Sequence, residues 1–222
     1  MFLTLPAGEP EAGPWRSVPA AALLELILTV TGDPSGRPRV VAVDGRGASG
    51  KSTLAARLHA LTPSSALVHT DDLAWHEPLF EWGHLLAGGV LRPLHEGRAV
   101  CYRPPQWQRR GRAGSIEVPA GLDVLFVEGT GASQREHSDL IDATVWVQAD
   151  FKRAEQRGIA RDVAAGVNGD ATQASAFWHD WMTAELAFLH VQRPWERAFA
   201  VVNGMPSGPV DFGHVVIAVP ST

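Results

Sequence analysis

Short apolar runs alternate along the chain with longer segments in which apolar residues recur at helical spacing. Six such runs are present, at residues 40–43, 65–69, 123–129, 143–150, 197–204 and 214–219. Short, continuous runs rich in β-branched residues are typical of buried parallel strands. We expect the first five runs to form the core of a sheet and the last to form an edge strand.

The segments between these runs predict helices. Apolar residues follow helical spacing at 21–30, 51–61, 151–163 and 171–191, and the Leu, Trp and His content of 73–97 predicts two helices around residues 87–89. Residues 99–121 are rich in turn formers and predict an irregular or hairpin segment. Strands that alternate with helices indicate a three-layer α/β fold, with a mainly parallel sheet of roughly five strands.

Composition fits one soluble domain. The chain has 222 residues, of which 45% are hydrophobic and 19% are charged. The net charge of −5 argues against a nucleic acid as partner. The single cysteine, Cys101, fits a reducing cytosol. The N-terminus lacks the features of a signal peptide, and the longest apolar stretch, "AALLELILTV", contains Glu25 and is too short to span a bilayer. A cytoplasmic protein without a membrane partner is expected.

The strongest chemical signal is the stretch "VVAVDGRGASGKST", residues 40–53. It fits the pattern G-x-x-x-x-G-K-[ST], in which backbone N–H groups cradle phosphate and the next helix points its positive end at the same anion. The lysine would reach the β- and γ-phosphates and the serine would ligate Mg²⁺. The predicted ATP-binding residues are Gly45, Arg46, Gly47, Ala48, Ser49, Gly50, Lys51, Ser52 and Thr53.

The same letters also contain the dinucleotide-binding pattern G-x-G-x-x-G, formed by Gly45, Gly47 and Gly50. A dinucleotide fold has no use for a cation and a hydroxyl directly after the last glycine, where this chain has Lys51 and Ser52. The phosphate loop is therefore favoured over the dinucleotide loop.

Carboxylates follow two of the predicted strands. Asp71 and Asp72 come after the run 65–69, and Glu128 closes the run 123–129. Ligands bind at the C-terminal edge of a parallel sheet, so one of these groups is suited to taking a proton from an acceptor hydroxyl. Capping of the next helix is the alternative role for one of the two aspartates.

Five motifs together resemble the uridine kinase, phosphoribulokinase and pantothenate kinase group of P-loop kinases, nearest to its uridine kinase-like members. They are "DGRGASGKST", "TDDLAW", "VLFVEGTGA", "RGIARD" and "QRPWERAFAVV", and the resemblance covers residues 40–204. The resemblance implies one kinase domain over residues 1–222, with an N-terminal extension (1–37), an acceptor-binding insertion (73–120) and a lid (150–170).

The resemblance also implies roles for individual residues. Asp71 matches the residue that deprotonates the acceptor, and Glu128 matches a residue near magnesium and acceptor. Mg²⁺ would be held by Ser52 and, through water, by Asp71 or Glu128. Arg157 and Arg161 match the lid arginines, and their spacing puts them on one helix face, where they could neutralise the transferred phosphate. Asn203 opens a loop that lines the adenine pocket in relatives.

Aromatic and donor side chains in the insertion suit a flat or ring-shaped polar acceptor. Trp75 and Trp82 lie seven positions apart and could equally form a core-facing stripe. The candidate acceptor-binding residues are Asp71, Asp72, Trp75, His76, Trp82, Tyr102, Arg103, Trp107 and Glu128. The family has aromatic residues directly after the base, where this chain has "DLA", so kinase chemistry is implied more strongly than uridine as acceptor.

The sequence thus predicts an ATP-dependent kinase that phosphorylates a hydroxyl of a nucleoside-like, sugar-like or other small polar molecule. A regulatory ATPase or switch stays open, as does a binding module without catalysis. So does a nucleotide kinase, in which Arg103, Arg109 and Arg110 would bind the acceptor phosphate. No His pair has metal-ligand spacing, so magnesium is the only metal expected. A homo-oligomer is also left open.

Overall fold

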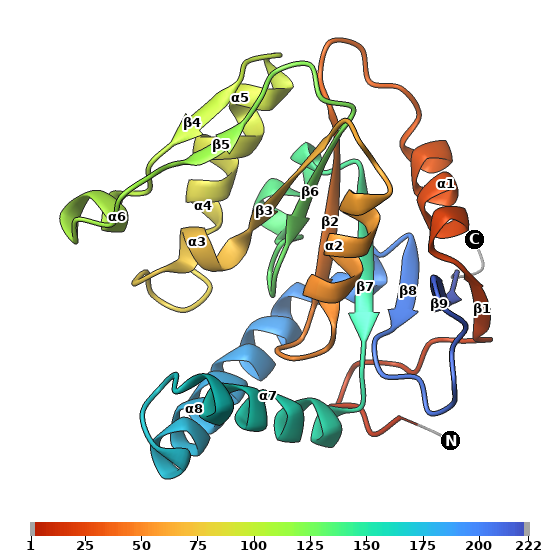
Figure 1. Cartoon of the computed structure of the whole chain (residues 1–222), viewed down its shortest axis with the longest axis vertical. Coiled ribbons are helices and arrows are strands. Elements are labelled where there is room, and N and C mark those ends of the chain that lie inside the picture. The colour runs from red at the N-terminus through yellow and green to blue at the C-terminus, as the bar shows by residue number, and fades with distance from the viewer. Residues whose placement is uncertain (1–2, 220–222) are drawn as a thin grey trace.

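A seven-stranded sheet forms the centre of the molecule (Figure 1), which is a computed structural model describing residues 3–219. Five strands run parallel, in the spatial order β3 (Ser65–His69), β6 (Val124–Glu128), β2 (Arg39–Gly45), β7 (Ala143–Gln148) and β8 (Ala200–Asn203). The α/β fold with a mainly parallel sheet is confirmed.

The expected strand number was too low, because two strands extend the parallel core. β9 (His214–Ala218) pairs antiparallel with β8, as expected for an edge strand. β1 (Arg16–Pro19) pairs antiparallel with β9 and was not predicted. β1 lies in a Pro- and Gly-rich lead and has four residues, so its strand conformation depends on a partner about 200 residues away in the sequence.

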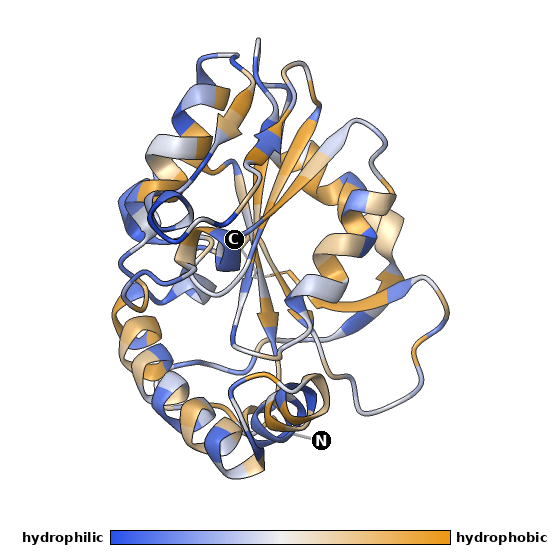
Figure 2. Cartoon of the chain, turned by 60° about the vertical axis from the view of Figure 1, so that its left-hand side comes forward, coloured by the Kyte–Doolittle hydropathy of each residue, from blue (hydrophilic) through white to orange (hydrophobic). Residues whose placement is uncertain are grey.

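Helices cover both faces of the sheet. Figure 2 shows the hydrophobic strands lying between them. On one face α1 (Ala20–Thr31) and α2 (Lys51–Ala60) pack against Val41 and Val43 of β2. On the other face Val40 and Ala42 pack against the helical segment that follows β3. Alternate residues of a strand point to opposite faces, so one apolar run supplies both cores.

The segment after β3 differs from the expected two helices around residues 87–89. It consists of α3 (Thr70–Ala74) and then α4 (Gly83–Leu86), the π-helical turn η1 (Ala87–Leu91) and α5 (Arg92–His95), which follow one another without a break. Gly89 lies against the ring of Tyr102, which leaves no room for a Cβ atom. The glycine therefore serves close packing and does not end a helix.

A small arm projects beside this segment. It is a two-stranded hairpin of β4 (Val100–Tyr102) and β5 (Ile116–Val118), with α6 (Pro105–Arg109) between the strands. A hairpin was one of the two forms expected here. Two 3₁₀ turns complete the fold, η2 (Arg135–Leu140) after β6 and η3 (Pro194–Glu196) before β8.

Helices α7 (Phe151–Ala165) and α8 (Ala171–Gln192) form a helical pair across the C-terminal edge of the sheet (Figure 1). Asp150 caps α7 through Arg153 N, and Asp170 forms a capping box with Gln173, so both helix starts are fixed by their own sequence. None of the helices in residues 3–219 is long and apolar enough to cross a membrane.

Candidate active site

The glycine loop is a tight turn between β2 and α2. Gly50 has φ of 105°, a conformation that favours glycine, and a Cβ on Gly45 would lie 2.7 Å from Ser49 Oγ. Lys51 Nζ donates to the carbonyl oxygen of Arg46 at 3.2 Å, so the lysine curls back over the loop. The loop thus presents backbone N–H groups and a cation to one concave surface.

Asp44, directly before the loop, fixes it from beneath. Its buried carboxylate accepts hydrogen bonds from the backbone N–H groups of Gly45 and Gly131, and from both the N–H and the hydroxyl of Ser133. The segment that follows β6 is therefore attached to the base of the phosphate loop.

Glu128 is the centre of a polar cluster at the sheet edge. It ends β6 and lies in register with His69 on β3 and Val43 on β2. Its Oε1 accepts from the Ser52 hydroxyl at 2.9 Å, and its Oε2 lies 2.7 Å from Nδ1 of His69. His69 could not be predicted as part of this cluster, because nothing in the sequence shows that it lies directly opposite Glu128.

The cluster keeps Glu128 ionised. Burial alone would raise the pKa of Glu128, but the hydrogen bond with His69, the charge of Lys51 and the Ser52 hydroxyl outweigh it and lower that pKa. The pKa of His69 is raised, chiefly by its hydrogen bond with Glu128 and against the effect of burial. A negative oxygen therefore stands beside the serine of the phosphate loop.

The two aspartates of α3 have different surroundings. Asp72 pairs with Arg112, and its carbonyl oxygen accepts from Trp107 Nε1 at 2.8 Å. The Asp71 side chain is exposed and makes no hydrogen bond or ion pair with residues 3–219. Of the two carboxylates, only that of Asp71 is therefore available to a ligand without breaking an existing contact.

A pocket of about 220 Å³ opens on the other side of the phosphate loop. Asn203 and Gly204 line it from the end of β8, and Gly50 and Thr53 line it from the phosphate loop and α2. A Cβ on Gly50 would lie 3.2 Å from the oxygen of Gly204, so the two backbones are in close contact. Asn203 and the phosphate loop therefore line the same pocket.

The lid arginines point in different directions. Arg157 lines the pocket beside Gly50. Arg161 bonds to its neighbour Asp162, with Nε 2.9 Å from Oδ1. Arg153, one turn before Arg157 on α7, donates to the Met205 oxygen at 3.1 Å. Of these three arginines of α7, Arg157 is therefore the one that the structure brings to the phosphate loop.

The predicted acceptor residues divide into surface and core. Trp75 is partly exposed and His76 is exposed, and the two rings contact each other at 4.4 Å between centroids. Tyr102 is half-buried against Gly89, and Arg103 donates to the Arg112 oxygen at 2.7 Å.

Trp82 and Trp107 require correction. Trp82 is 2% exposed and packs in the core with α4 and α5, so no surface of its ring is left for an acceptor. Trp107 is 5% exposed, and the Arg112 guanidinium lies 3.6 Å from its ring centroid. The seven-residue spacing of Trp75 and Trp82 was also compatible with packing in the core. The structure shows that Trp82 packs in the core.

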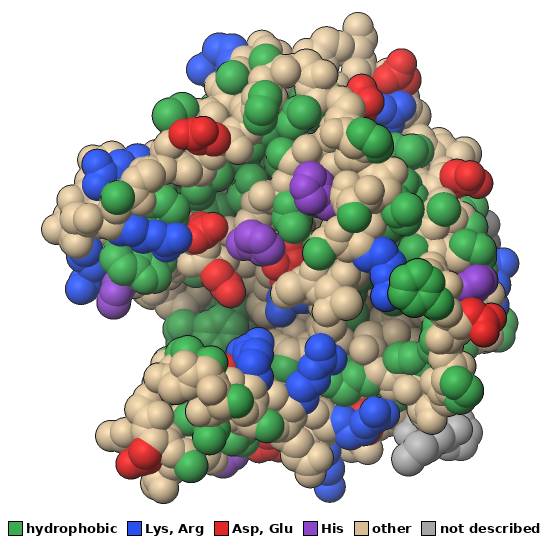
Figure 3. Space-filling view, viewed as in Figure 1, with side chains coloured by type: hydrophobic (Ala, Val, Ile, Leu, Met, Phe, Trp, Pro, Cys, Tyr) green, Lys and Arg blue, Asp and Glu red, His purple; other side chains and the backbone are tan. Residues whose placement is uncertain are grey.

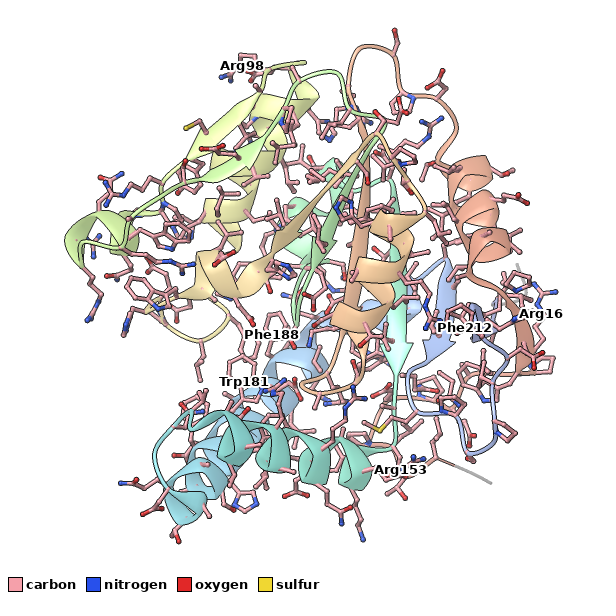
Figure 4. All side chains as sticks on the ribbon, in the orientation of Figure 1. Arg16, Arg98, Arg153, Trp181, Phe188 and Phe212 are labelled. Carbon is pink, nitrogen blue, oxygen red and sulfur yellow. The ribbon has the colours of Figure 1, made fainter. Side chains whose placement is uncertain are left out.

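An aromatic cluster that the sequence did not predict faces the hollow between α8 and the loop after α3. Phe80 stacks on Phe188 with centroids 4.2 Å apart, and Trp181 lies 5.1 Å from Phe80. Figure 4 shows Trp181 and Phe188 pointing from α8 toward this loop. In Figure 3 acidic and histidine side chains lie above the hollow, and basic side chains of the helical pair lie below it.

The residues at this edge fit a magnesium ion that arrives with a nucleotide. Within residues 3–219 no group of three or more His, Cys, Asp or Glu side chains could hold a metal by itself. Mg²⁺ in nucleotide sites takes one or two protein ligands in addition to phosphate oxygens and water. The exposed Ser52 hydroxyl and the ionised Glu128 beside it form such a donor set.

Comparison with protein-family models gives no match, and no curated protein matches the sequence. Solved structures do match. A protein assigned as a fructose transport system kinase, from Silicibacter sp. TM1040, shares 23% identity over 82% of this chain and 95% of its own, with a TM-score of 0.55. A possible uridine kinase from Bacillus stearothermophilus shares 18% identity over 82% and 96%, with a TM-score of 0.52.

A third match is D-glycerate 3-kinase from Cryptococcus neoformans, with 16% identity over 76% of this chain and 88% of its own and a TM-score of 0.53. All three identities are low, so these likenesses bear on architecture and not on substrate. The chain has the fold of these small-molecule kinases.

Proposed function

We propose that this protein is an ATP-dependent kinase that transfers the γ-phosphate to a hydroxyl of a small polar acceptor. The observation that carries the proposal is the hydrogen bond from the Ser52 hydroxyl to Glu128, which joins the phosphate loop to the carboxylate edge of the sheet. The base pocket lies on one side of the loop, and Asp71 follows β3 at the same sheet edge as Glu128. A kinase needs this order of nucleotide, phosphate and acceptor.

Each group then has a role that its surroundings support. The pocket beside Asn203 holds the base, and the loop N–H groups and Lys51 hold the phosphates. Asp71 accepts the proton of the acceptor hydroxyl, because its carboxylate is exposed while that of Asp72 is paired with Arg112. Arg157 lies beside Gly50 and stabilises the negative charge that develops on the phosphoryl group during transfer.

Magnesium would be held by Ser52, with Glu128 beside it, and when bound would supply positive charge to the phosphate oxygens. The acceptor would lie in the hollow between α3 and α8, against exposed parts of Trp75, His76 and the Phe80–Phe188 pair. Stacking surfaces of this kind suit a ring-shaped molecule.

The test is product analysis with Mg-ATP against nucleosides, sugars, amino-sugars, nucleotides and a reaction without acceptor. Lys51→Ala should lose phosphoryl transfer and keep the fold, whereas the matched variant Lys152→Ala, exposed on α7, should keep both. Unchanged turnover in Lys51→Ala would overturn the assignment.

The same assay separates the other candidate functions. ATP hydrolysis without any acceptor would indicate a regulatory ATPase, and transfer to a nucleotide would indicate a phosphate acceptor. Binding of ATP without turnover across all acceptors would indicate a binding module.

A further inference from the structure

Residues 4–12, which we name the N-terminal strap, lie against the C-terminal end of β7. The Ala12 N–H donates to Gln148 Oε1 at 3.0 Å, and Gln148 Nε2 donates to the Pro10 oxygen at 2.9 Å. Gln148 is the last residue of β7 and is buried. The strap is thus part of the packed structure, although none of its residues belongs to the proposed catalytic site.

Glu9 of the strap reaches beneath the phosphate loop and is 6% exposed. Its Oε1 accepts from Trp146 Nε1 at 2.9 Å and from Gln148 Nε2 at 3.0 Å. Its Oε2 accepts from Arg46 Nε at 3.0 Å. The guanidinium of a phosphate-loop residue is therefore fixed by a carboxylate from the N-terminal strap.

Arg46 is held from a second side. Its Nη1 lies 3.7 Å from Glu185 Oε2 on α8, and Glu185 Oε1 accepts from the Gly47 N–H at 2.7 Å. The Arg46 carbonyl also accepts from Lys51 Nζ. A buried guanidinium between two carboxylates cannot move without leaving a charge unpaired, so its position fixes the loop backbone and the point to which Lys51 is attached.

The other end of the strap holds the start of the lid. The Thr4 N–H donates to Asp150 Oδ2 at 2.8 Å, and the Phe151 N–H donates to the Thr4 oxygen at 2.8 Å. Asp150 Oδ1 meanwhile caps α7 by accepting from the Arg153 N–H at 3.0 Å. One short segment is thus attached both to the phosphate loop and to the first turn of α7.

We propose that Glu9 is a positioning residue for the phosphate loop, acting through Arg46, and that the strap couples nucleotide binding to the base of the lid. This inference rests on the proposed ATP site. Because coupling between two sites is reciprocal, a strap that favours the binding-competent loop must itself become more ordered when a nucleotide binds.

The first test compares Glu9→Gln with the matched control Glu11→Gln, whose side chain is exposed. Glu9→Gln should weaken ATP binding by about tenfold. It should leave adenosine binding unchanged, because the residues of the base pocket are not in the strap. Glu11→Gln should bind both as the wild type does. In an Arg46→Met background, Glu9→Gln should have no additional effect on ATP affinity.

Three outcomes would overturn the inference. These are unchanged or tighter ATP binding in Glu9→Gln, an equal loss for adenosine and ATP, and an undiminished effect of Glu9→Gln in the Arg46→Met background. The second outcome would indicate general destabilisation and no specific effect on the phosphate loop.

A measurement on the wild-type protein covers the case in which Glu9→Gln does not fold. Amide hydrogen exchange at Thr4, Glu9 and Ala12 should slow when ATP binds, although these amides lie outside the nucleotide site. If ATP protects amides of α2 and leaves the strap unchanged, the strap inference fails and the ATP site stands. If the wild type binds no ATP, the proposed function fails, and the inference fails with it.

Discussion

His69 Nδ1 lies 2.7 Å from Glu128 Oε2, across the register that pairs the ends of β3 and β6. The imidazole and the Ser52 hydroxyl each contact one oxygen of this buried carboxylate. Glu128 therefore cannot rotate without losing a partner, and its Oε1 stays directed at the serine of the phosphate loop. We therefore expect the response of turnover to magnesium to depend on the fixed, ionised carboxylate of Glu128.

Replacing Glu128 by Gln should raise the magnesium concentration that turnover requires, with little change in shape. We expect turnover to fall about 100-fold or more, because preorganised charge is lost where phosphoryl transfer needs it. ATP affinity measured without magnesium should change little.

His69 acts only through Glu128, so His69→Gln should lower turnover by about tenfold, the smaller effect of a supporting residue. Steady-state kinetics across a magnesium titration would check both, and wild-type turnover in Glu128→Gln would contradict the assigned role.

The neighbouring aspartates should separate catalysis from structure. Asp71→Asn should lower the rate of transfer by about 10²–10⁴-fold, the usual contribution of a general base, with ATP affinity largely kept. Asp72→Asn should lower the midpoint of urea unfolding, because its partner Arg112 loses an ion pair. Single-turnover rates and equilibrium unfolding on both variants are the measurements. If Asp72→Asn is the crippling change, the base has been assigned to the wrong residue.

Local motifs explain what the sequence could predict of the site. The loop from Gly45 to Thr53 is defined by consecutive residues, and its turn, lysine and helix start follow from short-range rules. Glu128 was identified because it ends a strongly apolar strand. The helical spacing of apolar residues likewise located α7 and α8, and the structure shows an aspartate capping the start of each.

Long-range packing explains what the sequence could not predict. His69 acquires its role from strand register, and Glu9 from a contact with a loop 37 residues away. Arg112 is one of several arginines in a polar segment, and only the fold places it over the Trp107 ring. β1 is a strand because β9 lies beside it.

At Gly158 on α7, helix propensity and side-chain packing predict opposite effects of an alanine substitution on stability. A Gly→Ala change in the interior of a helix normally stabilises it by about 1 kcal/mol. Here a Cβ would collide with the indole of Trp178 on α8. Gly158→Ala should therefore destabilise the protein, by about 1–3 kcal/mol, the usual cost of overpacking. Ala160→Gly, at an exposed position of the same helix, should show the propensity effect alone. A more stable Gly158→Ala in urea unfolding would disprove close packing of α7 on α8.

Asp142 gives a pH dependence of stability that is independent of the active site. Its Oδ2 accepts from Arg37 Nη1 at 2.7 Å and from the Val40 N–H at 2.7 Å, and its Oδ1 accepts from Arg37 Nη2 at 2.8 Å. Burial would raise the pKa of Asp142, but these hydrogen bonds and the charge of Arg37 outweigh it and lower the pKa. The stabilisation should therefore be complete above the unfolded-state pKa of about 3.9 and be lost as pH falls through the lower folded-state pKa.

Equilibrium unfolding of Asp142→Asn and wild type from pH 7 to pH 3 would test this sign. We expect the variant to be less stable by about 2 kcal/mol at pH 7, the cost of breaking charge-assisted hydrogen bonds. The difference should shrink below about pH 4, because the Asp142 carboxylate of the unfolded wild-type chain then binds a proton while that of the folded chain stays ionised. Asp33→Asn is the control, because its partner Arg39 is 3.3 Å away and the Asp33 side chain is 91% exposed, so its effect should be small throughout. A stability difference that stays constant down to pH 3 would mean that Asp142 does not act through its charge.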